Sequence, residues 1–138
     1  MNAVRKAVLL IALTCVGCSS HQRAEDFVPA EAAARRALEV YLEAWQRGHG
    51  AVEVPNTSPR VMGADSLHAT GRKLERFTVV GPTPSEAPRC FAVRLNLGSP
   101  TEEVRERYVV VGLDPIWVFR YPDYEMLMHW DHPMPAKK

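Results

Sequence analysis

The sequence lacks the features that mark several large classes of protein. Only 3 of its 138 residues are cysteine, and it contains no glycine-rich phosphate loop and no Gly-x-Ser-x-Gly segment. No internal repeat is visible, and no uncharged apolar run reaches the roughly 18 residues that a transmembrane helix requires. The sequence therefore offers no motif for nucleotide binding or for serine-hydrolase chemistry, and no segment of the length that spans a bilayer.

The N-terminus carries the pattern of an export signal. Arg5 and Lys6 precede the uncharged, mostly apolar residues 7–16 (AVLLIALTCV), and Gly17 and Cys18 follow directly. A helix of this length spans about 15 Å, half of a bilayer's hydrocarbon core, so the run is too short for a stable membrane span. It has the length of a signal-peptide core, and we predict that residues 1–17 are a signal peptide.

Residues 15–18 (CVGC) resemble the lipobox of bacterial lipoproteins, in which a small residue precedes the cysteine that receives the lipid. This resemblance implies cleavage before Cys18, a diacylglycerol on its sulfur and acylation of the new N-terminus, which together anchor a protein stably. It also implies a location in the cell envelope, on the outer membrane or on the periplasmic face of the inner membrane, with the bilayer as a partner. Cleavage before Cys15, secretion without lipid and an uncleaved signal anchor are the alternatives.

Removal of this leader changes the balance of charge and of cysteine. The whole chain has 17 basic and 16 acidic residues, and without Arg5 and Lys6 it has 15 basic residues and a net charge near −1. No basic stripe is visible along the sequence, so neither nucleic acid nor an anionic lipid surface is predicted as a binding partner. Cys90 would be the one free thiol, which excludes an internal disulfide, and we expect it to be a small, buried apolar residue.

Residues 31–47 give the clearest prediction of a helix, with Pro29 just before them and Gly48 just after, as helix boundaries prefer. Apolar residues recur there at spacings of three and four and share one face: Ala34, Ala37, Leu38, Tyr41, Leu42 and Trp45. We expect this face to pack against the core.

Residues 48–71 are predicted to be a long loop, with a short extended piece at 60–62, because prolines and glycines interrupt any period. Four strands are predicted after it, separated by glycine- and proline-containing turns: 73–80, 90–97, 104–111 and 116–120. Leu74 and Phe77 differ by an odd step, which predicts a bulge in the first strand. This order predicts an α+β fold in which one long N-terminal helix packs on a curved four-stranded antiparallel meander.

Several segments carry a resemblance to known families: ALEVYLEAWQRG, GRKLERFTVVGP, FAVRLNL and YVVVGLDPIWVFR. The helix-first arrangement resembles the cystatin-like and NTF2-like superfold, and the segments are similar to a group of small uncharacterised lipoproteins from planctomycete-type bacteria. The resemblance implies no activity, because this superfold hosts enzymes, transport factors and inert modules alike. We predict a lipidated tether at 18–29, an α+β domain at 30–121, and a C-terminal tail at 122–138 that docks on the domain.

The C-terminal tail is rich in side chains that bind soft metal ions: Met126, Met128, His129, His132 and Met134. Thioether sulfur together with imidazole suits Cu(I), so copper binding in the periplasm is one hypothesis for this tail. The other is that the tail simply packs on the domain as a short helical turn. The sequence predicts no other cofactor.

Asp65 and His68 form a second candidate site, with His49 nearby in the sequence. A carboxylate can orient an imidazole and raise its basicity, which is the minimum for general acid–base catalysis. In NTF2-like enzymes such groups line a pocket between helix and sheet, which here would include Tyr41 and Trp45. No nucleophile or cofactor motif accompanies them, and we expect Asp65 and His68 to be solvated loop residues.

The favoured hypothesis is a membrane-tethered lipoprotein of the cell envelope that is a non-enzymatic binding or structural module for an unknown protein partner. Trp117 and Phe119 share one face of the last predicted strand, and Ile116 and Val118 share the other. Since the helix can cover only one of these pairs, the other forms an apolar contact patch, unless the tail with Trp130 covers it. Copper binding and an enzyme that uses Asp65 and His68 are the alternatives.

Overall fold

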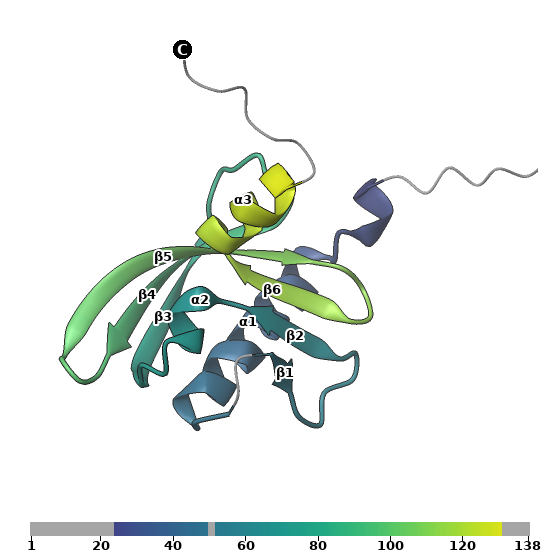
Figure 1. Cartoon of the computed structure of the whole chain (residues 1–138). Helices are drawn as coiled ribbons and strands as arrows, with labels where there is room; N and C mark the ends of the chain where they lie inside the picture. The colour runs from purple at the N-terminus through teal and green to yellow at the C-terminus, as the bar shows by residue number, and fades with distance from the viewer. Residues whose placement is uncertain (1–23, 50–51, 131–138) are drawn as a thin grey trace, which may run out of the picture.

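One mixed β-sheet carries helices on both of its faces (Figure 1). The computed structural model describes residues 24–49 and 52–130. The elements follow one another as η1 (Ala24–Phe27), α1 (Glu31–Gln46), β1 (Glu53–Val54), β2 (Val61–Ala64), α2 (Ser66–Ala69), β3 (Leu74–Pro82), β4 (Cys90–Leu97), β5 (Glu102–Val111), β6 (Ile116–Arg120) and α3 (Tyr121–Trp130). The α+β class predicted from the sequence is therefore correct.

Helix α1 occupies the segment for which the sequence predicts a helix and ends one residue earlier, at Gln46. All six residues assigned to its apolar face are buried. Gly48, two residues after the end of the helix, has a φ of +80°, a left-handed conformation that glycine adopts without strain. The amide of Gly48 donates to the carbonyl of Trp45, and that of His49 donates to the carbonyl of Ala44. These bonds satisfy carbonyls that the end of a helix leaves unpaired.

The sheet has six strands in the order β1-β2-β6-β5-β4-β3, so the predicted four-stranded antiparallel meander is wrong. Strands β3 to β6 do pair antiparallel in sequence order. Strand β2, however, joins β6 in parallel, and β1 pairs with β2 at the edge. These two strands have 2 and 4 residues, which is too short for an alternating pattern to be visible among the prolines of this region.

Strand β3 contains the predicted irregularity. Its register with β4 shifts between Leu74 and Arg76 and again between Val79 and Gly81. Strand β4 alternates as expected, with Phe91, Val93, Leu95 and Leu97 buried on one side. These side chains pack against α1 in the larger of two core clusters.

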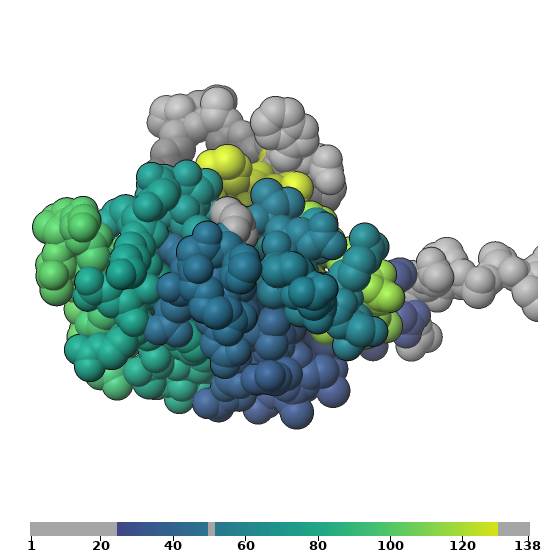
Figure 2. Space-filling model, turned by 90° about the horizontal axis from the view of Figure 1, so that it is seen from below, coloured from purple at the N-terminus to yellow at the C-terminus, as the bar shows by residue number. Residues whose placement is uncertain are grey.

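The two faces of the sheet differ, and we call the face that packs against α1 the inner face and the face beneath α3 the outer face (Figure 1). Seen from the α1 side, the helix lies across the middle of the molecule (Figure 2). On the outer face a smaller apolar cluster contains Cys90, Val109 and Phe119, with Tyr121 and Tyr124 of α3 packed against it. Within the described residues, no helix has the length and apolar character that crossing a bilayer requires.

Candidate functional site

Asp65 and His68 lie at the start of the four-residue helix α2, directly after β2. Asp65 is the N-cap residue, and its Oδ1 accepts hydrogen bonds from the amides of Leu67 (2.9 Å) and His68 (3.1 Å). Such a cap satisfies amides that the first turn of a helix leaves unpaired. Both side chains are buried, with residue exposures of 4% and 7%. The expectation that Asp65 and His68 are solvated loop residues is therefore wrong.

Two tyrosines reach this capped turn from distant parts of the chain. The hydroxyl of Tyr108, on β5, donates to Asp65 Oδ2 at 2.6 Å. The hydroxyl of Tyr41, on α1, lies 2.8 Å from Nδ1 of His68. Nε2 of His68 lies 3.1 Å from the carbonyl oxygen of His49, which can only accept a hydrogen bond. Neutral His68 therefore carries its proton on Nε2, and Tyr41 donates to Nδ1.

Trp45 completes the packing around the imidazole. Its ring stacks on that of His68 with centroids 4.5 Å apart and an interplanar angle of 13°. Its Nε1 donates to the carbonyl of Arg72 at 2.8 Å, which ties α1 to the segment after α2. A surface hollow of about 500 Å³ borders this site, and Trp45 and His68 line it. Tyr41 and Asp65, the other two residues predicted to form a pocket, are instead enclosed in the core region.

Arg120, at the end of β6, joins this cluster to α3. Its Nε lies 3.7 Å from Asp65 and 3.3 Å from Asp123, and its Nη1 lies 3.2 Å from Glu106. Nη2 donates to the hydroxyl of Ser66 at 2.9 Å. The guanidinium has donors in a rigid fork, which suits several acceptors at once. One cation thus neutralises part of the charge of three carboxylates from β5, α3 and the turn before α2.

The surroundings of these groups shift their protonation equilibria. Burial lowers the pKa of His68, and the bond to the His49 carbonyl and the charge of Asp65 only partly oppose this. Burial, reinforced by the charge of Asp65, raises the pKa of Tyr41 and of Tyr108 well above that of a free tyrosine. All three side chains are therefore neutral near pH 7, and each hydrogen-bonding proton in the cluster has a defined acceptor.

This geometry suits a structural network better than acid–base catalysis. The carboxylate of Asp65 contacts the backbone amide of His68, and within the described residues no hydrogen bond joins it to the His68 ring. Both ring nitrogens of His68 already have partners. A general base needs a nitrogen within reach of a substrate proton, and His68 offers none in this arrangement.

The methionine and histidine cluster of the tail is only partly described. Met126, Met128 and His129 lie on α3 with exposed side chains, whereas His132 and Met134 lie outside the described residues. Among the described residues, no group of three or more histidine, cysteine, aspartate or glutamate side chains is placed to hold a metal ion. Copper binding, which would also use methionine sulfur, stays a prediction.

Helix α3 covers part of the Trp117 and Phe119 face, as one of the two hypotheses expects. The rings of Phe119 and Tyr124 meet edge to face with centroids 5.8 Å apart. Beside this contact the outer face keeps an apolar groove of about 700 Å³, lined in part by Trp117, Leu127 and Phe27. Leu127 and Phe27 are 53% and 48% exposed. Within residues 122–130, the part of the tail that the structure describes, α3 therefore covers one side of the patch and leaves the groove on the other side.

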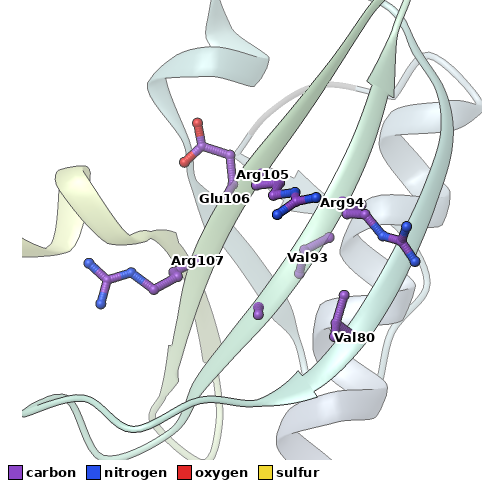
Figure 3. A pocket seen from close by; sticks show the side chains of 7 residues that line it. Val80, Val93, Arg94, Arg105, Glu106 and Arg107 are labelled. Carbon is purple, nitrogen blue, oxygen red and sulfur yellow. The ribbon is translucent and has the colours of Figure 1, made fainter.

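Beyond α3 the outer face carries arginines, with Glu103 on the same side of β5. Arg94 of β4 lies directly opposite Arg105 of β5, and Arg107 lies on the same side two residues further along. Figure 3 shows Arg105 extending toward Arg94, while Glu106 points away from both. These residues line an open hollow of about 410 Å³. The sequence alone does not predict this site, because no run of basic residues marks it and only the strand register brings the arginines together.

Comparisons of the chain with protein-family models, with curated protein sequences and with solved structures found no match. The resemblance to the cystatin-like and NTF2-like superfold therefore stays a prediction.

Proposed function

We propose that this protein is a lipid-anchored, non-enzymatic module of the cell envelope that makes its contacts through the outer face of its sheet. The observation that carries the proposal is the order Arg5 and Lys6, the apolar residues 7–16, and Cys18 after Gly17. A short charged segment, a short apolar core and a small residue before cysteine are what an export and lipidation signal needs.

The arrangement of the domain supports a role in binding rather than in catalysis. The polar groups of the inner face are enclosed and bonded to one another, as the pairs between Tyr108 and Asp65 and between Tyr41 and His68 illustrate. The outer face instead presents exposed apolar side chains and arginines. Exposed apolar patches with a polar border are typical of contact surfaces.

The place where the N-terminal segment joins the domain also supports the outer face as the contact face. The amide of Gly112, at the end of β5, donates to the carbonyl of Phe27 at 2.7 Å, and Phe27 lines the apolar groove. Cys18 and Ala24 are six positions apart in the sequence. Even a fully extended chain of this length spans only about 20 Å. A lipid on Cys18 would therefore hold the outer face close to a bilayer.

The test is expression of the full chain in a bacterium that processes lipoproteins, followed by detergent phase partition and mass spectrometry of the N-terminal peptide. We expect the wild-type protein in the detergent phase, with acyl chains on Cys18, and the Cys18→Ser variant in the aqueous phase or unprocessed. Cys15→Ser is the matched control and should keep the anchor. An unmodified Cys18 in the wild-type protein, or equal behaviour of both variants, would refute the lipid anchor.

A further inference from the structure

The outward-facing residues of β5 change from charged to apolar along the strand. Side chains of a strand alternate between the two faces, so the outer face of β5 carries, in order, Glu103, Arg105, Arg107, Val109 and Val111. The two arginines border the open hollow, while Val109 lies in the outer apolar cluster and Val111 lines the groove. Val109 itself is fully buried, so the basic hollow and the apolar groove lie on the same face of the sheet, on either side of the outer apolar cluster.

Two arginines of the outer face lie next to each other, although their like charges repel. Arg94 and Arg105 are direct cross-strand partners, and like charges at such positions destabilise a sheet. Arg76 adds a further positive charge next to them, opposite Asn96. Within the described residues neither Arg94 nor Arg105 has an ion-pair partner, whereas Arg120 on the inner face has three. An external anion would relieve this repulsion.

The hollow has the shape and chemistry for a phosphate group attached to an apolar body. Ala92 and the 60% exposed Val80 line it together with the arginines, and Figure 3 shows Arg105 extending toward Arg94 while Arg107 points the opposite way. Arg107 is held over the ring of Tyr121, 3.8 Å from its centroid, which fixes that side of the hollow to the start of α3. Guanidinium forks bind phosphate oxygens in a bidentate manner.

We propose that the outer face lies against the membrane and that Arg94, Arg105 and Arg107 bind the phosphate groups of anionic phospholipids. This proposal rests on the lipid anchor proposed above, because the anchor brings the bilayer to this face. Exposed apolar side chains of the same face, among them Phe27, Leu127 and Met128, are placed to enter the interfacial region. Each arginine near an anionic surface adds attraction that falls with salt.

The experiment uses a chain that begins at Ser19, so that neither the leader nor Cys18 contributes to binding. Both core clusters consist of residues between Ala34 and Tyr124, so this chain keeps all of them, and circular dichroism verifies its folding. Co-sedimentation is measured with vesicles of phosphatidylcholine alone and with vesicles that also contain phosphatidylglycerol. We expect binding to the anionic vesicles only, and we expect 0.5 M salt to weaken it by about tenfold or more.

The substitution Arg94→Glu gives the sharpest variant, because it replaces the repulsive pair with an ion pair to Arg105. We expect anionic vesicle binding to fall by at least about tenfold while the melting temperature stays equal or rises. Arg47→Glu is the matched control, since it changes net charge equally at an exposed position at the end of α1. It should keep most of the binding.

Three results would overturn the proposal: equal binding of the wild-type chain to neutral and anionic vesicles, equal losses in both variants, or release by millimolar inorganic phosphate. The last would identify a soluble anion, rather than a membrane, as the ligand. Because the tested chain lacks Cys18, these outcomes are independent of whether Cys18 is acylated. A failure of the lipid anchor and a failure of the arginine site can therefore be told apart.

Discussion

The inner and outer faces of the sheet differ in whether their charged side chains have partners of opposite charge. On the inner face Asp65 receives bonds from Tyr108 and from two amides and lies beside Arg120, so its charge is compensated inside the protein. On the outer face Arg94 and Arg105 repel each other across two strands and have no acidic partner among the described residues.

This contrast separates stability from binding. An enclosed and fully bonded polar cluster fixes how α1, α2 and the sheet pack, and removal of one member leaves the others buried without partners. Open charges and open apolar side chains add little to folding, and they are free to meet something outside the chain. Mutations on the two faces should therefore differ in kind, with loss of stability on one and loss of binding on the other.

The largest effect is expected for Asp65→Ala on the inner face. This change removes the N-cap of α2, leaves the buried hydroxyl of Tyr108 without an acceptor and removes a partner of Arg120. Loss of one member of a buried charged network costs about 3 kcal/mol or more in unfolding free energy. Urea denaturation followed by circular dichroism measures the difference.

Glu39→Ala is the control for this experiment, since Glu39 forms an exposed i,i+4 ion pair with Arg35. Such pairs contribute less than about 1 kcal/mol. If Asp65→Ala were no more destabilising than Glu39→Ala, the inner cluster would not be the structural network described above.

How far the sequence predicts this structure depends on the range of each interaction. The periodicity of residues 31–47 and the alternation of β4 are local, and both predictions agree with the structure. The pairing of β2 with β6 and the contact between Asp65 and Tyr108, 43 residues apart, depend on topology and left no local signal. The spacing of Asp65 and His68 indicates a local pair, but the prediction that both are solvated is wrong, because a capped turn buries both side chains.

The next largest effect is expected for deletion of residues 122–138. The deletion removes Tyr124 from Phe119, and it removes Asp123 from Arg120 and from the amide of Ser66. We expect unfolding free energy to fall by about 2 kcal/mol, from lost apolar burial and lost hydrogen bonds, and fluorescence of an apolar dye to increase.

Leu127→Ser is the counterpart of this deletion within α3. Leu127 is 53% exposed, so the change should alter the unfolding free energy by no more than about 0.5 kcal/mol while it lowers dye binding. A large loss of stability in Leu127→Ser would mean that the groove is closed rather than open.

A smaller effect is expected from the protonation of His68. Burial lowers its pKa in the folded state, whereas the unfolded chain takes up a proton near the ordinary value of about 6.5. Below that pH the unfolded state binds more protons, so the unfolding free energy falls as the pH falls from about 6.5 to the folded-state pKa. Unfolding curves measured across this pH range should show that His68→Gln lacks this fall in unfolding free energy. The control His129→Gln, on the exposed end of α3, should keep it. Parallel pH profiles of wild type and His68→Gln would contradict it.

The smallest change considered compares the reactivity of a thiol at a buried and at an accessible position of the outer face. Cys90 is 4% exposed, and burial raises the pKa of its thiol, so it should react with a thiol reagent about 100-fold more slowly before unfolding than after it. Two residues further along β4, Ala92 lines the arginine hollow, and in Ala92→Cys the new thiol should react at once, because the arginines favour its thiolate. Two outcomes would contradict this: fast reaction of Cys90 in the native wild-type protein, or slow reaction of the second thiol in Ala92→Cys. Either would mean that the outer face is not divided into a packed and an open part, as the geometry of β4 and β5 requires.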